Sequence, residues 1–430
     1  MVCSKMSNLK TNIVHTGDCF DVLPTLPDNS VHAVVSDPPY GLAFMGRAWD
    51  DFEPKEYQEW CEKWASECLR VLNPGGHMLA FSGNRTHHRL FTGVEDAGFE
   101  IRDTLTWHYG SGFPKASDIS KTIDKRADAE REVVGEKTTP DGKSYSERQQ
   151  NNHAKSSVAF DDTATINSGD KTKITAPATD AAKKWDGWKT GLKPSTEFVV
   201  MARKPYDGAT VDSVLEHGTG ALNIDACRIE SGERPNRTHD GGCVFNVGEY
   251  DQESRMADGT TTEGRYPSNL IFDEVAAEQL DADNEHRTDS NRSISGGDDR
   301  NQDGWGMGDT ETQAYEGSGG PSRYFYTSKA TKAERTLDGK IDNAHPTVKP
   351  GDLMQWLVKL VTAENQIVLD PFCGSGTTLR AAKDLNRQFI GIEQQAKWAD
   401  VARVRSGLTP KDPAIVRGDE SQTGIESYTD

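Results

Sequence analysis

Two short segments near opposite ends of the chain restrict the folds that this sequence can adopt. Each follows an apolar run typical of a strand buried in a parallel sheet, at residues 31–35 and at residues 366–369. The first run leads into an Asp-Pro-Pro-Tyr turn at 37–40, and the second into a Gly-Ser-Gly-Thr-Thr turn at 374–378 that opens a helix. Open α/β sheets bind ligands beyond the carboxyl ends of their strands. We therefore expect an α/β fold in which the two turns lie on neighbouring strands of one sheet.

The apolar pattern divides the chain into segments of different character. Helices are expected at 54–72, 85–97 and 351–362, with strands at 77–81, 101–109, 197–202 and 389–393. Hydrophobic residues make up only 34% of the chain and glycines number 40, so much of it should be loop or insertion. The segments expected are a first half of the sheet at 1–114, a polar and partly flexible insertion at 115–185, a further strand at 186–205, an irregular region at 206–330, a second half of the sheet at 331–405, and a loose tail at 406–430.

Charge and cysteine content exclude several classes of protein. The net charge of −19, from 49 basic and 68 acidic residues, argues against a nonspecific nucleic-acid binder. DNA is not excluded, because the acidity is uneven: residues 281–320 carry ten acids and three bases. The seven cysteines form no CxxC pair, which favours reduced thiols over a zinc site or disulfides. With no apolar run of membrane-spanning length and no signal-peptide core, we expect a cytoplasmic protein that needs no metal.

The glycine-rich turn predicts a site for a nucleoside cofactor. Gly374 and Gly376 allow the backbone to approach a ligand closely. No Gly-Lys-Ser/Thr follows, which excludes a Walker loop, and Leu379 occupies the third glycine position of the dinucleotide fingerprint. Glu393 ends the next strand, 19 residues after Gly374, at the offset of an acid that binds ribose hydroxyls. The glycines alone would equally suit a tight structural turn, but with Glu393 they favour a nucleoside without a pyrophosphate.

The Asp-Pro-Pro-Tyr turn predicts a site for an exocyclic amine. Pro38 and Pro39 fix the backbone and remove its donors, leaving the Asp37 carboxylate and the Pro38 carbonyl as acceptors. Such acceptors bind the hydrogens of an amine, and Tyr40 offers a flat face for the ring that bears it. For the tetrapeptide alone, a surface turn with a packed tyrosine would also explain the pattern.

The two motifs in this order resemble the amino-group DNA methyltransferases that use S-adenosylmethionine, in the permuted beta class whose catalytic motif comes first. Further segments carry the resemblance at 107–115, 191–194 and 345–350, and the segment 265–273 resembles members from phages and prophages. The resemblance implies a doubly wound, mostly parallel, Rossmann-like methyltransferase sheet, circularly permuted, with irregular insertions for target recognition. Its catalytic half would be 1–114, its target-recognition region 206–330 and its cofactor-binding half 331–405.

The resemblance also implies a role for individual residues. Asp37 and the Pro38 carbonyl would hold the target amine, and Tyr40 would stack on a flipped base. Trp107 or Tyr109 would form the opposite wall, although either could equally be a buried strand residue. Residues expected around the cofactor are Asp18 at the adenine amine, Glu393 on the ribose, Thr347, Lys349 and Pro350 near the methionine end, and Asp370, Phe372, Gly374, Gly376 and Thr377 elsewhere around it. Asp18 could equally be an ordinary turn acid, and a surface lysine stays open as the alternative for Lys349. Methyl transfer from a sulfonium needs no metal and no histidine base.

The resemblance favours N6 of adenine as the methyl acceptor, because an aspartate heads the motif. Ser36 sits one position too early to be the serine typical of N4-cytosine enzymes, but cytosine stays open. Methylation of an RNA or of a protein glutamine also stays open, as does an inactive DNA-binding regulator with this fold. The expected partner is double-stranded DNA with a short recognition sequence, together with a restriction endonuclease if the enzyme belongs to a restriction–modification pair.

Overall fold

A computed structural model describes the chain in two compact units, Met1–Ser111 with Ser195–Asp430, and Gly112–Pro194. Each unit is described by itself. The residues described are 9–42, 50–110, 112, 116–136, 173–237, 256–282, 287–288, 318–328, 334, 336–341, 343, 345 and 348–416.

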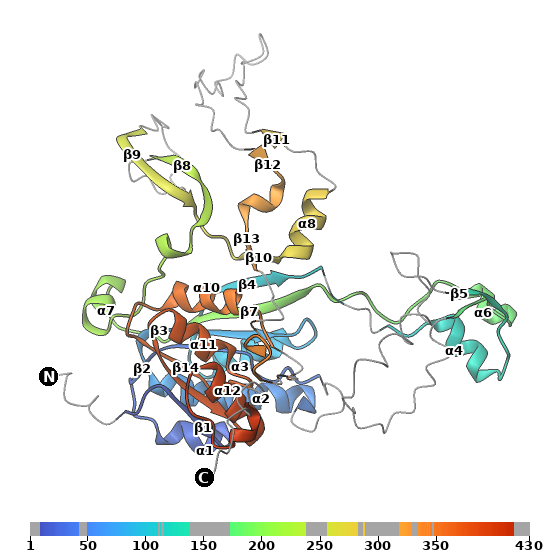
Figure 1. The fold of residues 1–430 in the computed structure, drawn as a ribbon, viewed down its shortest axis with the longest axis horizontal. Coiled ribbons are helices and arrows are strands. Elements are labelled where there is room, and N and C mark those ends of the chain that lie inside the picture. The colour runs from blue at the N-terminus through green and yellow to red at the C-terminus, as the bar shows by residue number, and fades with distance from the viewer. Residues whose placement is uncertain are drawn as a thin grey trace, which may run out of the picture. The chain divides into compact units, whose positions relative to one another are not determined.

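A nine-stranded sheet forms the first unit (Figure 1). Its order is β1-β15-β14-β2-β3-β7-β4-β10-β13, and β7 runs antiparallel to both neighbours while every other neighbouring pair is parallel. The fold is therefore a mostly parallel, Rossmann-like α/β sheet, as predicted. The strands are β1 (Ile13–Thr16), β2 (Val31–Ser36), β3 (Leu72–Ser82), β4 (Glu100–His108), β7 (Thr196–Arg203), β10 (Leu270–Asp273), β13 (Tyr326–Ser328), β14 (Ile367–Asp370) and β15 (Gln388–Glu393).

The two strands that precede the turns are direct neighbours in this sheet. Strand β14 pairs with β2 in parallel, with Val368 opposite Ala33 and Leu369 opposite Val34. In Figure 1 the blue β2 and the red β14 lie together although they come from opposite ends of the chain. Parallel strands end at the same edge, so both turns leave the sheet on one side. The expectation that the two ends of the chain fold side by side is confirmed.

Helices cover both faces of the sheet, which makes the fold doubly wound. One core joins Val34 of β2 and Leu369 of β14 to Trp64 of helix α2. The other joins Val35 to Leu357 of α10 and Leu379 of α11. Because successive residues of a strand point to opposite faces, an almost uninterrupted apolar strand such as β2 serves both cores. The helices are α1 (Cys19–Val22), α2 (Pro54–Val71) and α3 (His87–Asp96) on the first face, and α10 (Gly351–Val361), α11 (Thr377–Asp384) and α12 (Ala396–Arg405) on the second.

Helix α2 begins and ends close to the predicted residues. Pro54 occupies its first turn, and the side chains of Glu53 and Glu56 form a capping box there. Strand β3 then begins at Leu72, earlier than the expected residue 77. Leu72 already pairs with Val31 of β2, and Gly75, at φ +77°, donates a backbone hydrogen bond of 3.0 Å to the Lys204 carbonyl, so the sheet extends through this segment.

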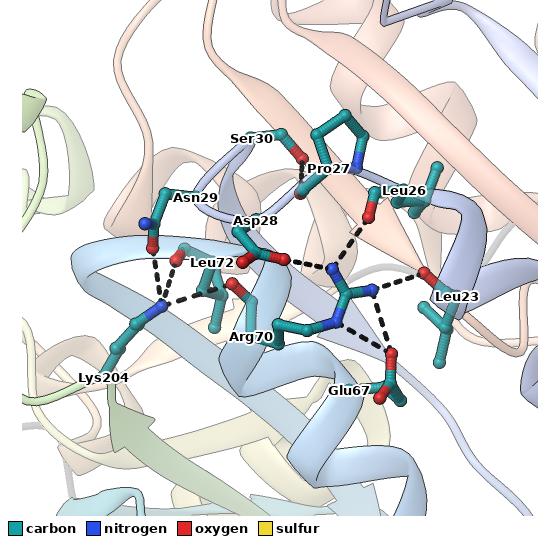
Figure 2. A network of polar contacts seen from close by, with 10 residues as sticks. All are labelled: Leu23, Leu26, Pro27, Asp28, Asn29, Ser30, Glu67, Arg70, Leu72 and Lys204. Carbon is teal, nitrogen blue, oxygen red and sulfur yellow. Dashed lines mark hydrogen bonds and ion pairs between the residues drawn. The ribbon is translucent and has the colours of Figure 1, made fainter. Parts of the chain in front are cut away.

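A polar network fastens the end of α2 to the loop that leads into β2 (Figure 2). Arg70 donates to the carbonyl oxygens of Leu23 at 2.8 Å and Leu26 at 2.9 Å, and forms ion pairs with Asp28 and Glu67. The Lys204 ammonium, just after β7, donates to the Asn29 side chain of the same loop and to the Leu72 carbonyl at the start of β3, each at 2.7 Å. Through these contacts one arginine and one lysine bind carbonyl groups of the loop and of the first residue of β3. The contacts fix where β2 starts, and so where the Asp-Pro-Pro-Tyr turn emerges.

Part of the region predicted for target recognition belongs to the sheet. Strand β10 runs parallel to β4, and β13 extends the sheet by one more strand. The remaining elements of the region are α7 (Thr210–His217), β8 (Ile229–Arg237), β9 (Met256–Arg265), α8 (Glu274–Ala282), β11 (Arg287–Thr288), β12 (Ser318–Gly319) and the short 3-10 helices η6 (Asp225–Cys227) and η7 (Pro321–Tyr324). Most of the acidic stretch 281–320 lies outside the described residues.

The second unit contains short helices that the polar sequence did not predict. These are α4 (Ile119–Arg126) and α6 (Asp180–Lys184), which accompany the strand pair β5 (Val133–Glu136) and β6 (Lys173–Thr175). The buried Asp124 carboxylate joins them, because it accepts hydrogen bonds from Arg131, from the backbone of Ala178 and from Thr179. The unit therefore depends on polar contacts rather than on an apolar periodicity. The limits of the domains predicted from the sequence stay predictions.

In neither unit do the described residues include a helix that is both long and apolar enough to cross a lipid bilayer.

Candidate active site

The Asp-Pro-Pro-Tyr turn follows directly on β2 and is held from outside by two side chains. The Tyr57 hydroxyl donates to the Pro39 carbonyl at 2.9 Å. The Asp50 carboxylate accepts hydrogen bonds from the backbone of Gly41 at 2.7 Å and of Leu42 at 3.1 Å. Gly41 has φ +65°, a conformation that favours glycine. The turn is thus fixed before any ligand binds.

Within the turn, Tyr40 is oriented by two carboxylates, one from the turn itself and one from β7. Its hydroxyl oxygen lies 2.8 Å from Oδ1 of Asp37 and 3.0 Å from Oε2 of Glu197. Burial, followed by the negative charges of Asp37 and Glu197, raises the pKa of Tyr40 well above its ordinary value. The tyrosine is therefore a neutral ring held by its hydroxyl.

Lys349 brings a positive charge into the same place. Its ammonium lies 2.6 Å from Oδ2 of Asp37, 3.1 Å from the Tyr40 hydroxyl and 3.3 Å from Oε2 of Glu197. Its side chain is only 9% exposed. Burial alone would lower the pKa of Lys349, but the attraction of Asp37 and Glu197 outweighs burial and raises it. We refer to Asp37, Tyr40, Glu197 and Lys349 as the Asp37 cluster.

The sequence predicts only part of this cluster. It places Lys349 near the methionine end of a cofactor, and that role stays a prediction; the structure places its ammonium on Asp37. Glu197 is predicted only as the first residue of a strand. The sequence does contain a feature that could have predicted a paired Glu197, because this acid stands directly before the apolar run Phe198-Val199-Val200. Charged residues at the head of a buried strand are rare unless they are paired.

Trp107 on β4 and Tyr109, just beyond the end of β4, lie beside the Asp37 cluster. Trp107 is the register partner of Glu197, and its ring centroid lies 5.3 Å from that of Tyr109. Burial and the charge of Glu197 raise the pKa of Tyr109, while Lys349 partly offsets them. Among the described residues, nothing accepts a hydrogen bond from the buried Trp107 Nε1. The indole N–H of a residue beside the cluster therefore has no intramolecular acceptor in the part of the chain that the structure describes.

The glycine-rich turn between β14 and α11 needs its glycines. Gly374 has φ +50° and Gly376 has φ +80°. A Cβ atom on Gly376 would come within 2.8 Å of Ala402, so a larger residue would be both strained and crowded. Backbone hydrogen bonds from Cys373 to Ile392 and from Gly376 to Cys373 close the turn, after which Thr377 begins α11.

Asp370 connects the two turns. Its Oδ1 atom accepts a hydrogen bond of 2.5 Å from the Ser36 hydroxyl and one of 3.1 Å from the Phe372 backbone. The residue is 2% exposed. Burial raises the pKa of Asp370 to about 6, although hydrogen bonds from Ser36 and Thr378 act in the opposite direction. Asp370 thus holds the end of β14 to the end of β2; its expected place around the cofactor stays a prediction.

Two more acids lie at the ends of β15 and β1. Glu393 accepts hydrogen bonds from the backbone of Gly374 at 3.1 Å and of Gln395 at 2.8 Å, and burial raises its pKa. Asp18 caps α1 by accepting from the Phe20 backbone at 3.0 Å. The two strand ends meet where the Gly17 backbone donates to the Glu393 carbonyl at 3.0 Å. Both carboxylates keep lone pairs that could accept from the hydroxyl or amino groups of a nucleoside.

These residues fit a nucleoside cofactor that lacks a pyrophosphate. The acids Asp18 and Glu393 lie just after β1 and at the end of β15, and the closed glycine turn that opens α11 follows β14, the other neighbour of β15. Phe372 adds an aromatic face, 5.3 Å from Trp60 and 5.4 Å from Trp64 between ring centroids. Pro350 is the first residue before α10. Thr347 lies outside the described residues. Within the described part of the chain, no group of three or more His, Cys, Asp or Glu side chains could hold a metal ion.

A mostly parallel sheet that carries a glycine-rich turn suited to a nucleoside beside an Asp-Pro-Pro-Tyr turn suited to an amine is the arrangement expected of a nucleoside-dependent enzyme that acts on an amino group. The family model described as DNA methylase, for N6 and N4 methyltransferases, matches residues 31–403. This match covers most of the chain, and the protein therefore belongs to that family of DNA methyltransferases, which use S-adenosylmethionine.

Known proteins similar to this chain carry related descriptions. The type II methyltransferase M.HindIII of Haemophilus influenzae is 24% identical, over 92% of this chain and 95% of that protein. M.HinfI of Haemophilus influenzae is 44% identical over 78 residues, which are 18% of this chain and 22% of the relative. Among solved structures, M1.HpyAVI matches with a TM-score of 0.37 and 15% identity, over 92% of this chain and 98% of that chain. The PvuII cytosine-N4-specific DNA methyltransferase matches with a TM-score of 0.43 and 14% identity, over 91% and 85%.

Proposed function

We propose that this protein methylates the N6 amine of adenine in double-stranded DNA, at a short recognition sequence. The observation that carries the proposal is the position of Asp37 and Tyr40. They follow β2 at the sheet edge where the neighbouring strand β14 ends in the glycine-rich turn. An amine bound at Asp37 would therefore be close to a cofactor bound at that turn.

In this proposal the Asp37 carboxylate and the Pro38 carbonyl accept the two hydrogens of the target amine. Binding both hydrogens in this way favours a tetrahedral nitrogen whose lone pair is free to attack. When bound, S-adenosylmethionine supplies an electrophilic methyl group on a sulfonium. As the C–N bond formed and the methyl–sulfur bond broke to leave a neutral thioether, the nitrogen would gain positive charge, and the negative Asp37 would stabilise it until a proton leaves for water. The protein contributes alignment and a fixed negative charge, and it needs no histidine base.

The aromatic residues suit a base that has left the double helix. Enzymes that modify a base inside duplex DNA extrude it into a pocket with flat side chains. Tyr40 would stack on the base, and Trp107 or Tyr109 would form the other wall. The buried Trp107 Nε1, which lacks an acceptor among the described residues, could donate to a ring nitrogen of that base.

On the cofactor side we propose contacts from the ends of three strands. Glu393 would accept from the ribose hydroxyls and Asp18 from the adenine amine, while Phe372 would contact the adenine ring. Asp370, Gly374, Gly376 and Thr377 would shape the turn around the cofactor, and Thr347, Lys349 and Pro350 would lie near its methionine end.

The contact made by Ser36 supports adenine over cytosine. The Ser36 hydroxyl donates to Asp370, and the residue has no exposed surface. It is thus engaged away from the amine site and does not replace Asp37 at the head of the motif. N4 of cytosine is the second candidate, because the family includes both kinds of enzyme and both bases carry an exocyclic amine.

The alignment with M.HindIII, a type II methyltransferase, spans nearly the full length of both proteins. We propose that this chain is also a type II enzyme, with the region 206–330 reading much of the recognition sequence. A restriction endonuclease with the same recognition sequence would then be its partner.

The test uses PCR-amplified DNA, which carries no methyl groups, and labelled S-adenosylmethionine. Asp37→Ala and Tyr40→Ala should each abolish transfer to DNA while cofactor binding, measured by calorimetry, stays unchanged. Asp207→Ala, at an exposed aspartate after β7, is the matched control and should transfer normally. RNA and protein acceptors should stay unlabelled. Transfer by the Asp37→Ala variant, or preferred labelling of RNA or protein, would contradict the proposal.

A further inference from the structure

The ammonium of Lys349 occupies the acceptor that the target amine would need. Asp37 Oδ2 is 2.6 Å from Lys349 Nζ, closer than any other atom of the cluster. An ammonium and an amine are both nitrogen donors of similar size, so Lys349 resembles the group that Asp37 is expected to bind. In the DNA-free protein the amine site is therefore filled by a side chain of the protein itself.

Lys349 is held there by every donor that it has. Its ammonium offers three hydrogens, and the acceptors within reach are Asp37, the Tyr40 hydroxyl and Glu197. The ammonium also lies 4.9 Å from the ring centroid of Phe81 and 5.4 Å from that of Tyr40. Such a partly desolvated cation cannot simply leave for solvent without losing all of these contacts.

Methyl transfer makes this cation unfavourable at Asp37. The attacking nitrogen becomes positive as the C–N bond forms, and a second positive charge on the same carboxylate opposes that change. Glu197 offers the remedy, because its Oε2 atom lies 3.3 Å from Lys349 Nζ and 3.0 Å from the Tyr40 hydroxyl. A small movement of the ammonium from Asp37 towards Glu197 would keep it paired.

We propose that Lys349 occupies Asp37 as a stand-in for the target amine, and that Glu197 is a positioning residue that retains the ammonium when the amine displaces it. The inference rests on the proposed function. Glu197 acts through Lys349 and Tyr40 and does not touch the substrate. Without the charge of Glu197, Lys349 stays on Asp37 and competes with the base.

A double-mutant cycle of Glu197→Gln and Lys349→Met tests this competition. Glu197→Gln should lower kcat on saturating PCR-amplified DNA by about 10- to 100-fold. The dissociation constant for S-adenosylmethionine should change by less than about twofold, since the effect lies at the amine site. Removing Lys349 in the Glu197→Gln background should then recover at least about tenfold in kcat, because the competing cation is gone. Glu95→Gln and Lys63→Met, at exposed positions on α3 and α2, are the matched controls.

A purely structural pairing gives a different pattern. The double variant would then be as slow as Glu197→Gln or slower, with a melting temperature that falls in step, and that result would overturn the inference. A crystal structure of the DNA-free wild type provides the second measurement: the inference requires Lys349 Nζ within hydrogen-bond distance of both Asp37 and Glu197. If wild-type protein methylates DNA but the double variant shows no recovery, the inference fails alone. If wild-type protein methylates no amine in DNA, the proposed function fails instead.

Discussion

Replacing Asp370 with asparagine removes a buried charge without changing the shape of the side chain. Burial raises the pKa of this carboxyl to about 6, from 3.8 in an unfolded chain. The shift of roughly two units corresponds to about 3 kcal/mol of folding free energy. An amide oxygen can still accept from the Ser36 hydroxyl and from the Phe372 backbone, which are the contacts of Oδ1.

The sign of the effect follows from the raised pKa. The fold favours the protonated acid, so its contribution to stability is fully present below pH 3.8 and is lost as the pH rises through about 6. Wild-type protein therefore carries the full penalty at pH 8, and Asp370→Asn does not. We expect the variant to be more stable by up to about 3 kcal/mol at pH 8, with a difference that shrinks steadily towards pH 4.

Urea unfolding, followed by tryptophan fluorescence between pH 4 and pH 8, measures this difference. Asp207→Asn is the matched control, because that aspartate is exposed and its replacement should leave stability almost unchanged. A difference between Asp370→Asn and wild type that stays constant over this range would refute the reasoning. So would a variant that is less stable than wild type at pH 8.

Three further substitutions test other parts of the account. Gly376→Ala should lower the stability of the fold by about 1–2 kcal/mol and weaken cofactor binding, because a Cβ at φ +80° would lie 2.8 Å from Ala402. Thermal shift measures the stability and calorimetry the binding. An unchanged affinity for S-adenosylmethionine would count against a cofactor at this turn. Arg70→Met should lower the free energy of unfolding by about 1–2 kcal/mol, because it removes the Arg70 donor to the Leu26 carbonyl and one of the two donors to the Leu23 carbonyl. Urea unfolding would disprove this by showing a change below about 0.5 kcal/mol. Trp107→Phe keeps a ring but removes the indole donor, so affinity for DNA should fall about 5- to 10-fold while affinity for the cofactor stays constant. Equal affinity of the variant and the wild type for DNA in a filter-binding assay would exclude Trp107 as a base contact.

The neighbouring positions of the two turns could be predicted from the sequence because each follows a short, almost continuously apolar run. Such runs indicate strands buried on both faces, and the carboxyl ends of parallel strands share one edge of a sheet. Val34 and Leu369, which are opposite each other in the register, come from these two runs. The special backbone of Gly374 and Gly376 could be predicted for the same reason, since glycine is the residue that adopts it without strain.

Other features depend on contacts that no local pattern encodes. Glu197 reaches Tyr40 and Lys349 only because β7 inserts antiparallel between β3 and β4. Helices α4 and α6 lack a long apolar stripe, and the buried Asp124 carboxylate joins their segments through hydrogen bonds from distant residues. Strand β10 is visible in the sequence as the short apolar segment 270–272, but its place beside β4 follows from pairing alone.

The most direct measurement is nucleoside mass spectrometry of DNA from host cells that lack adenine methylation and express this chain. The account predicts N6-methyladenine with the wild-type protein, confined to one short sequence when the modified positions are mapped, and none with Asp37→Ala. N4-methylcytosine in its place would contradict the choice of base. The absence of both modified bases, with folded protein present and S-adenosylmethionine bound, would contradict an amine site at Asp37.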